Sequence, residues 1–260
     1  MKKYLLDVMP KKAITLVMGK ITKSNASKVF IKPYIKMYGI NIKEVEKNIE
    51  EYKNLNEFFT RKLKEEERKI ENADIVSPSD GFIKEKGTIR NGKVFQIKGD
   101  EYELKSLLRS EEKAKELEEG SYVNIYLSPK DYHRIHSPIN GRIKKCEHIE
   151  GKLYPVNDNG IENIKGLYTK NERVNVYIEN DNYEIILSNV GALIVGSVKL
   201  AFCELGNNEK RDMDIEVSQG QEIGMFEFGS TVVLLVKMKN KKEEMKINKK
   251  EGIKMGEKIL

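Results

Sequence analysis

Residues 174–198 read VNVYIENDNYEIILSNVGALIVGSV. The stretch contains three short apolar runs, separated by Asn, Asp and Gly: Val174–Ile178, Tyr183–Leu187 and Val190–Val198. Runs of this length that are rich in β-branched and aromatic residues and end at turn-forming residues are typical of strands. Two similar runs, Tyr122–Leu127 and Thr231–Val236, lie on either side in the chain. Together they predict an all-β core of barrel or sandwich type.

Before about residue 72 the pattern is helical. At ~100° per residue, Ile14, Val17, Met18 and Ile21 fall on one face of a helix, and lysines fall on the other. A second apolar group follows at residues 29–37, where Pro33 is expected to start or kink a helix. A third segment, Ile42–Lys64, also has apolar residues at helical spacing.

After residue 72 the one segment expected to be helical is Glu111–Glu119. We therefore predict a mainly β protein, α+β overall. It has an α-helical N-terminal region at residues 1–71 and a β-rich catalytic domain at residues 72–260, barrel-like or sandwich-like in its core.

Composition excludes several classes of protein. The chain has 260 residues, and its 47 basic against 41 acidic side chains give a formal charge of +6. No run approaches the ~18–20 apolar residues of a membrane-spanning helix, and Asp7 and Pro10 interrupt the start too early for an export signal. No basic motif interleaved with aromatics favours nucleic acid. Two cysteines fit a reducing cytoplasm.

The segment Tyr126–Pro138 contains two of the three histidines, His133 and His136. Histidines three apart share a side in a helix but lie on opposite faces of a strand. Histidine is the usual general acid and base near neutral pH. The pair alone fits a structural role as well as a catalytic one, and His148 is expected at the surface.

Two more segments carry candidate chemistry. Asp80 precedes Gly81, which is typical of a turn, but a carboxylate there could also orient a histidine. Gly229 and Ser230 precede an apolar run, which is typical of a turn entering a buried strand. Glycine before serine also leaves the glycine carbonyl open to the serine hydroxyl, as an N-to-O acyl shift would need.

The chain resembles the phosphatidylserine decarboxylase family in many separate blocks, which occur in the family's order. They are Asn56–Leu63, Val76–Gly81, Phe95–Gly99, Asp131–Pro138, Leu153–Asn157, Asn171–Val174, Val190–Ala192 with Val195–Ser197, and Gly220–Thr231. The chain departs from the family at Phe228, where Leu or Gly is common, and at Tyr154–Pro155, where Phe-Ser is more usual. The resemblance covers residues 9–236.

The resemblance implies that Asp80, His136 and Ser230 form a protease-like triad. His136 would take the proton of the Ser230 hydroxyl while Asp80 orients the ring. Attack on the Gly229 carbonyl would then split the chain into residues 1–229, the β chain, and residues 230–260, the α chain. Ser230 would become a covalent pyruvoyl cofactor.

In turnover, the family's pyruvoyl group forms an imine with phosphatidylserine, releases carbon dioxide and yields phosphatidylethanolamine. The resemblance places His133 beside this chemistry and implies no metal. It also places Tyr154, Val156 and Asn157 near the substrate.

The family also implies partners. The substrate is phosphatidylserine in a membrane, so residues 9–38 are expected to dock on an anionic lipid surface, which makes the protein peripheral on the cytoplasmic side of the cell membrane. The alternative is that this apolar stripe packs on the protein's own core. The two cleaved chains would form a heterodimer, and the family implies that this dimerises.

Two other functions are weighed against this one. The first is a metal-dependent hydrolase with His133 and His136 as ligands, although the sequence offers no obvious third ligand. The second is a lipid-binding module that has lost processing. The presence of Asp80, His133, His136 and Ser230 argues against that loss.

Overall fold

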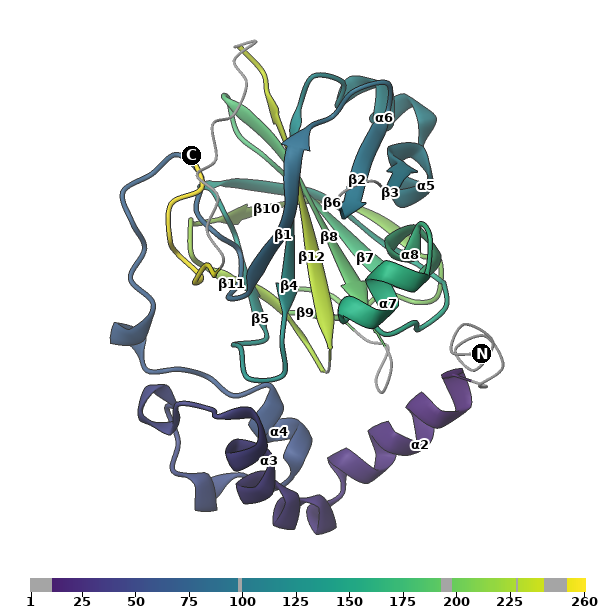
Figure 1. Ribbon diagram of the computed structural model, residues 1–260. Coiled ribbons are helices and arrows are strands. Elements are labelled where there is room, and N and C mark those ends of the chain that lie inside the picture. The colour runs from purple at the N-terminus through teal and green to yellow at the C-terminus, as the bar shows by residue number, and fades with distance from the viewer. Residues whose placement is uncertain (1–10, 98–99, 193–197, 228, 241–251) are drawn as a thin grey trace.

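The computed structural model describes residues 11–97, 100–192, 198–227, 229–240 and 252–260. Helices gather at one end of a β body (Figure 1). They are α2 (Lys11–Lys23), α3 (Ile31–Tyr38) and α4 (Leu55–Phe59), with short 3-10 turns between them. The prediction of a mainly β chain with an N-terminal helical region is therefore confirmed.

The β body is built on a seven-stranded antiparallel sheet. Its order is β1 (Phe82–Thr88), β4 (Ser121–Leu127), β12 (Ser230–Met238), β8 (Tyr183–Gly191), β7 (Arg173–Glu179), β6 (Gly141–Ile149) and β10 (Lys210–Val217). The apolar runs expected to be strands fall on β4, β7, β8 and β12. The central strand, β12, has neighbours on both sides, which fits its continuous apolar sequence.

A three-stranded sheet lies against one face of the large sheet. It consists of β5 (Arg134–His136), β11 (Glu222–Phe226) and β9 (Val198–Leu200). The main core fills the space between the two sheets, with Val232 and Leu234 from the large sheet and Ile135 and Phe226 from the small one. This two-layer packing matches the expected sandwich-like core.

The other face of the large sheet carries a second core. It packs against a hairpin and four short helices: β2 (Lys93–Ile97), β3 (Asp100–Glu103), α5 (Leu104–Leu108), α6 (Glu111–Glu116), α7 (Asp158–Asn163) and α8 (Leu167–Lys170). Only α6 was expected from the sequence. The prediction of a single helical interruption was therefore wrong.

The helical layer has a small core of its own, including Ile31, Tyr52 and Phe58. Pro33 lies in the first turn of α3, as predicted. The segment Ile42–Lys64 is not one helix but two 3-10 turns followed by α4. Among the described residues, no helix is both long and apolar enough to cross a membrane.

The C-terminal residues 252–260 lie along the segment that precedes β1. Backbone hydrogen bonds join Gly81 and Ile253 in both directions, at 2.9 and 2.8 Å, and link Ser77 to Gly256 and Glu257. Ile253 and Ile259 are buried in the main core. The end of the chain therefore holds the loop that contains Asp80.

Candidate active site

Ser230 is the first residue of β12. Its side chain is fully buried, and its hydroxyl has no hydrogen-bond partner among the described residues. Alternation along the strand places it on the same face as Val232 and Leu234, which pack in the main core. A buried hydroxyl without a partner is costly. Ser230 shares this feature with several other buried side chains among the described residues, and it leaves the serine oxygen free to react.

Gly229 lies just outside the strand. Among the described residues, a Cβ built at this position would meet only Ala192, at 3.7 Å, which is an ordinary contact. Contacts within the described part of the chain therefore do not demand glycine here. Phe228, between this residue and β11, lies outside the described residues, as do residues 195–197 of the family's blocks.

His133 is fully buried at the start of the small sheet. Its Nδ1 lies 2.8 Å from the carbonyl oxygen of Asp131, and its Nε2 has no partner among the described residues. Phe59 of α4 covers the ring, with the two ring centroids 4.0 Å apart. Burial and, to a smaller extent, the charge of Arg61 lower the pKa of His133 to about 3. The ring is therefore neutral at physiological pH.

His136 has partners at both ring nitrogens. Nδ1 lies 2.9 Å from the carbonyl oxygen of Gly220, and Nε2 lies 3.2 Å from the hydroxyl of Tyr132. Because a carbonyl oxygen only accepts, Nδ1 carries the proton and Nε2 accepts from Tyr132. Burial lowers the pKa of His136, while the nearby charges of Glu222 and Asp80 oppose that shift.

Asp80 is held by a charge network. Its carboxylate forms a bidentate pair with Arg68, at 2.8 Å from Nε and 2.5 Å from Nη2, and accepts the backbone N–H of Met255 at 2.9 Å. Arg68 also contacts Glu44, at 3.0 Å. Both side chains of the Asp80–Arg68 pair are almost fully buried.

The expected hydrogen bond from the His136 ring to the Asp80 carboxylate is absent among the described residues. Arg68 occupies both Asp80 oxygens, and the Gly220 carbonyl orients the imidazole in place of a carboxylate. The backbone of His136 nevertheless donates to Pro78 at 2.8 Å, so the two motifs are neighbours. Asp80 acts on His136 through its charge.

The expected triad residues come from the loop before β1, the end of β5 and the start of β12. On β4, Leu127 pairs with Ser230 on one side and Tyr126 pairs with Phe82 on the other. The loop of Asp80 and the hydroxyl of Ser230 therefore flank the end of β4. No hydrogen bond joins Ser230 to either histidine within the described part of the chain.

The two histidines have separate surroundings. His133 precedes β5 and His136 is its last residue, and each ring has its own partners. This geometry does not favour the metal hydrolase, whose two ligands would have to converge on one ion. Among the described residues, no cluster of three or more His, Cys, Asp or Glu side chains is arranged to hold a metal.

The residues expected near the substrate serve the fold in this structure. Tyr154 and Val156 are buried in the second core. Asn157 caps α7, accepting the N–H of Gly160 at 3.0 Å. His148 was expected at the surface, and this prediction was wrong. Its side chain is buried in β6, with Nε2 3.4 Å from Oε1 of Glu172.

Sequence reasoning did not identify Arg61, Arg68, Tyr132 or Gly220 as site residues. Arg61 and Tyr132 belong to blocks shared with the family, and Gly220 begins another. Their positions were therefore available in the sequence. Their partners were not, because Gly220 and His136 are 84 residues apart.

The chain is similar to known proteins over nearly its whole length. The phosphatidylserine decarboxylase family profile matches residues 55–260. A protein of Brevibacillus brevis named phosphatidylserine decarboxylase proenzyme is 39% identical over 265 residues, covering 97% of this chain and 95% of its own. A protein of the same name from Bacillus thuringiensis subsp. konkukian is 38% identical over 245 residues, covering 94% and 90%.

Proposed function

The chain belongs to the phosphatidylserine decarboxylase family, and we propose that it cleaves itself between Gly229 and Ser230 and then converts phosphatidylserine to phosphatidylethanolamine. Decarboxylation is the activity in the names of its relatives, and the word proenzyme in those names fits a chain that must be processed. The observation that carries the proposal is the buried Ser230 hydroxyl, which lacks a partner among the described residues.

In the proposed cleavage, His136 is the general base. Its Nε2 already has a lone pair, since Nδ1 holds the proton. To take the proton of Ser230, Nε2 must exchange the hydroxyl of Tyr132 for that of the serine. The negative charges of Glu222 and Asp80 then favour the imidazolium that results.

The proposed cleavage passes through an ester. The Ser230 oxygen bonds to the Gly229 carbonyl carbon as the peptide C–N bond breaks, which converts an amide to an ester. Loss of a proton from the Ser230 Cα then breaks its Cβ–O bond and leaves Gly229 as a carboxylate. Water adds to the remaining dehydroalanine, ammonia leaves, and residue 230 becomes a pyruvoyl group.

The surroundings of Ser230 fit such a group. The Ser230 oxygen, which would leave as part of the Gly229 carboxylate, is not tied to any partner among the described residues. When formed, the pyruvoyl group supplies a ketone that takes up the electrons left by the departing carbon dioxide. His133 Nε2 is the base we assign to turnover, moving a proton between the substrate's amine and its α-carbon.

We propose that the two products stay together as a heterodimer. Residue 230 begins β12, which is hydrogen-bonded to β4 on one side and β8 on the other. Residues 252–260 also pair with the segment that contains Ser77 and Gly81. The small chain would therefore remain fixed at both ends. Native mass spectrometry would show both this heterodimer and the homodimer of it that the family implies.

Intact mass spectrometry tests the cleavage. The wild type should give fragments 1–229 and 230–260, the second one ammonia lighter than a fragment that begins with serine. Ser230→Ala should remain a single chain that no carbonyl reagent labels. An uncleaved wild type that decarboxylates phosphatidylserine would refute the proposal.

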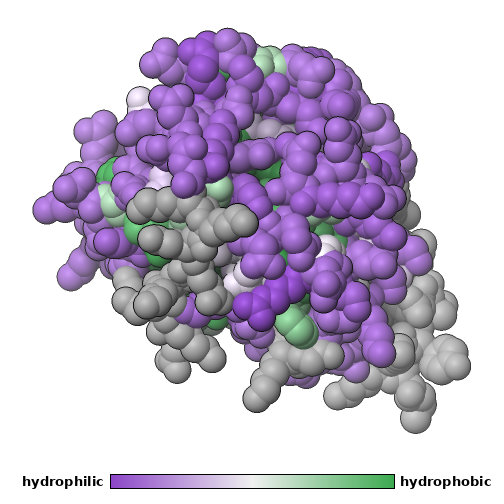
Figure 2. Space-filling model, turned by 90° about the horizontal axis from the view of Figure 1, so that it is seen from above, coloured by the Kyte–Doolittle hydropathy of each residue, from purple (hydrophilic) through white to green (hydrophobic). Residues whose placement is uncertain are grey.

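We also propose that the helical layer docks peripherally on the cytoplasmic face of an anionic membrane. Of the nine exposed large apolar side chains in the described residues, seven lie in residues 17–42: Val17, Ile21, Val29, Phe30, Met37, Tyr38 and Ile42. The opposite end of the molecule is mostly hydrophilic (Figure 2). The alternative that Val17 and Ile21 pack on the protein's own core is not favoured, since both are exposed.

Charge favours a lipid with anionic headgroups. Lys20 and Lys36 are exposed on α2 and α3, the helices that carry most of these apolar side chains, and form no ion pair within the described residues. A basic side chain near such a surface contributes about 1 kcal/mol. The substrate itself is anionic.

Sedimentation with phosphatidylserine/phosphatidylcholine vesicles tests docking. Phe30→Ser and Met37→Ser together should weaken binding. Phe95→Ser should not, because Phe95 is similarly exposed, at 42% against 55% for Phe30, but lies on β2, outside the helical layer. Equal binding by the wild type and both variants, or an equal loss of binding in the two variants, would contradict the proposal.

A further inference from the structure

We propose that Arg61 is a positioning residue for His133, so that the helical layer takes part in catalysis as well as in docking. This inference rests on the proposed role of His133 in decarboxylation. Arg61 follows α4 and is 3% exposed. It lies where the helical layer meets the loop that connects β4 to His133.

A single carbonyl group joins the two side chains. Arg61 Nη2 donates to the Asp131 carbonyl oxygen at 3.0 Å and to that of Lys130 at 2.6 Å. The same Asp131 oxygen lies 2.8 Å from His133 Nδ1. A carbonyl oxygen has two lone pairs, so it can accept from both donors at once.

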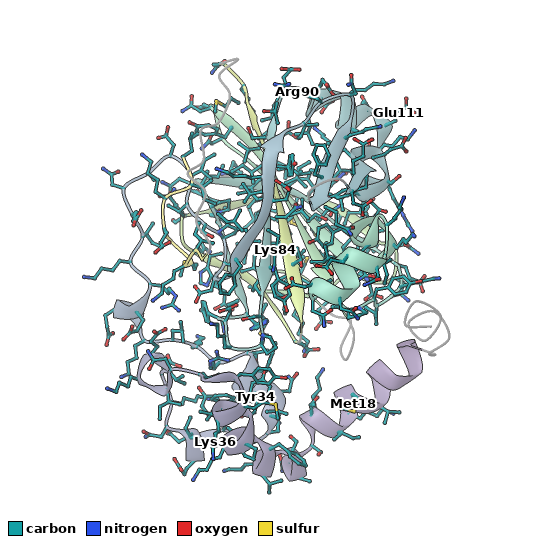
Figure 3. The ribbon with its side chains drawn as sticks, viewed as in Figure 1. Met18, Tyr34, Lys36, Lys84, Arg90 and Glu111 are labelled. Carbon is teal, nitrogen blue, oxygen red and sulfur yellow. The ribbon has the colours of Figure 1, made fainter. Side chains whose placement is uncertain are left out.

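Other side chains of the helical layer hold the same loop. The hydroxyl of Tyr34, on the side of α3 that faces the β body (Figure 3), donates to the Pro129 carbonyl at 2.9 Å. Arg134 donates back to the Thr60 carbonyl at 3.0 and 2.8 Å. Successive carbonyls before His133 are therefore fixed from the helical layer, and the position of the ring depends on it.

This arrangement selects one tautomer of His133. The Asp131 carbonyl can only accept, so the proton lies on Nδ1 and the lone pair on Nε2. Nε2 is buried and has no partner among the described residues, while Phe59 packs on the ring. The structure thus presents an unprotonated nitrogen that is held ready to accept a proton.

The charge of Arg61 acts in the same direction. Charged side chains near the loop come from several elements: Arg61, Lys130, Asp131, Arg134 and Glu227. The Asp131 carboxylate is turned away, accepting from the backbone and hydroxyl of Ser128. Of these charges, that of Arg61 acts to lower the pKa of His133, which keeps the ring neutral.

A purely structural role explains Arg61 poorly. Its Nε and Nη1 have no partners among the described residues, and its guanidinium lies over the Phe58 ring, 5.2 Å from the centroid. Burying a charge with part of its donors unused is unfavourable, and an apolar side chain would often serve the fold as well. An effect of the buried charge on His133 explains Arg61 better.

The first test requires no activity. In uncleaved Ser230→Ala protein, ¹⁵N NMR of labelled histidine reports the tautomer and protonation of only three histidines. We expect His133 to stay neutral, with the proton on Nδ1, down to pH 5. In Arg61→Met it should take up a proton at higher pH and show both tautomers. An unchanged His133 would overturn the proposal.

Arg173→Met is the matched control. Arg173 is 2% exposed and also donates to backbone carbonyls, those of Ser106, Leu107, Thr169 and Asn171. It is the first residue of β7, and its acceptors lie in α5, in α8 and just after α8. Its loss should leave the His133 signals as they are. If both substitutions changed His133 alike, the effect would be general loosening rather than positioning.

The second test uses the cleaved enzyme. Arg61→Met should still cleave itself, with kcat lowered roughly 10- to 100-fold and KM little changed. Arg61→Lys keeps the charge but not the planar grip on two carbonyls, so it should give an intermediate kcat and a neutral His133. It also covers the case in which Arg61→Met does not fold.

Full activity in either variant would overturn the positioning role. A wild type that is uncleaved or inactive would instead refute the proposed function, without affecting the NMR result.

Discussion

His133 and His136 lie three residues apart, yet the protein surrounds them differently. A backbone carbonyl fixes the proton on Nδ1 of each ring, from Asp131 in one case and Gly220 in the other. At Nε2 the two diverge. His136 accepts from Tyr132, whereas His133 has no partner among the described residues.

Burial lowers the pKa of both rings, but their charged neighbours differ. Near His136 the charges of Glu222 and Asp80 favour the protonated ring against that of Arg134, while near His133 the charge of Arg61 opposes protonation. One histidine can therefore hold a proton taken from serine, and the other is kept as a free base. The comparison suggests that His136 serves cleavage and His133 serves turnover.

Replacing His136 should have the largest effect. We expect His136→Ala to remain a single chain, because the substitution removes the base that we assign to the Ser230 proton. Loss of a general base slows a reaction by roughly 10²- to 10⁴-fold. Incubation followed by a denaturing gel measures the rate. Cleavage at the wild-type rate would remove the distinction between the two histidines.

Replacing His133 should separate cleavage from turnover. We expect His133→Ala to be cut normally and to carry the pyruvoyl group, but to decarboxylate roughly 10²- to 10⁴-fold more slowly. A cleavage gel and an assay of carbon dioxide release give the two rates on the same sample. Failure to cleave would assign both histidines to one step.

Asp80→Asn tests how the Asp80 carboxylate contributes to stability and to cleavage without a hydrogen bond to His136. Among the described residues, the substitution leaves buried Arg68 with Glu44 as its one charged partner, which should lower the free energy of unfolding by roughly 3 kcal/mol. Cleavage should also slow, since a charge that favours protonated His136 is lost.

Asp214→Asn is the control for this substitution, because its pair with Arg142 is exposed. Urea unfolding should place the control near wild type. Cleavage of Asp80→Asn at the wild-type rate would limit Asp80 to a structural role.

These contrasts show which parts could be predicted from the sequence. The strands followed from apolar runs such as Thr231–Val236, and the position of Ser230 at the start of β12 followed from the Gly-Ser-Thr turn before it. The helix expected over Ile42–Lys64 was wrong because Asn48 and Asn54 cap new turns and interrupt it. Local residue propensities predict where a strand lies, but they do not predict where a helix ends and a new one begins.

Contacts between distant residues were not predictable in the same way. Asp80 pairs with Arg68 and makes no hydrogen bond to His136. Nothing in the sequence indicates that Asp80 would bind Arg68 rather than His136. Cys146 and Cys203 lie with their sulfurs 3.5 Å apart, although nothing near either suggested pairing. Such choices depend on how the two sheets pack.

The free energy of unfolding should fall in acid, because His133 is buried in its neutral form. Its pKa is about 3 in the folded protein, against about 6.5 for a histidine in an unfolded chain. Between these values only the unfolded chain binds the proton, so stability falls as pH drops below 6.5. His133 alone accounts for about 2 kcal/mol between pH 6.5 and 5. His133→Gln should therefore lose less stability than wild type over this range in urea unfolding. Parallel losses would place the titrating group elsewhere.

Tyr132→Phe should have the smallest effect, and it has the opposite sign. Removing the hydroxyl frees His136 Nε2 from the partner that competes with Ser230, while the Gly220 carbonyl still fixes the tautomer. A hydrogen bond of about 1 kcal/mol corresponds to roughly fivefold faster cleavage. Turnover by the cleaved enzyme should not change, because His133 makes no contact with this hydroxyl. The half-time of cleavage after rapid refolding, compared with wild type, measures the effect. Slower cleavage would mean that Tyr132 assists His136 rather than competing with the serine.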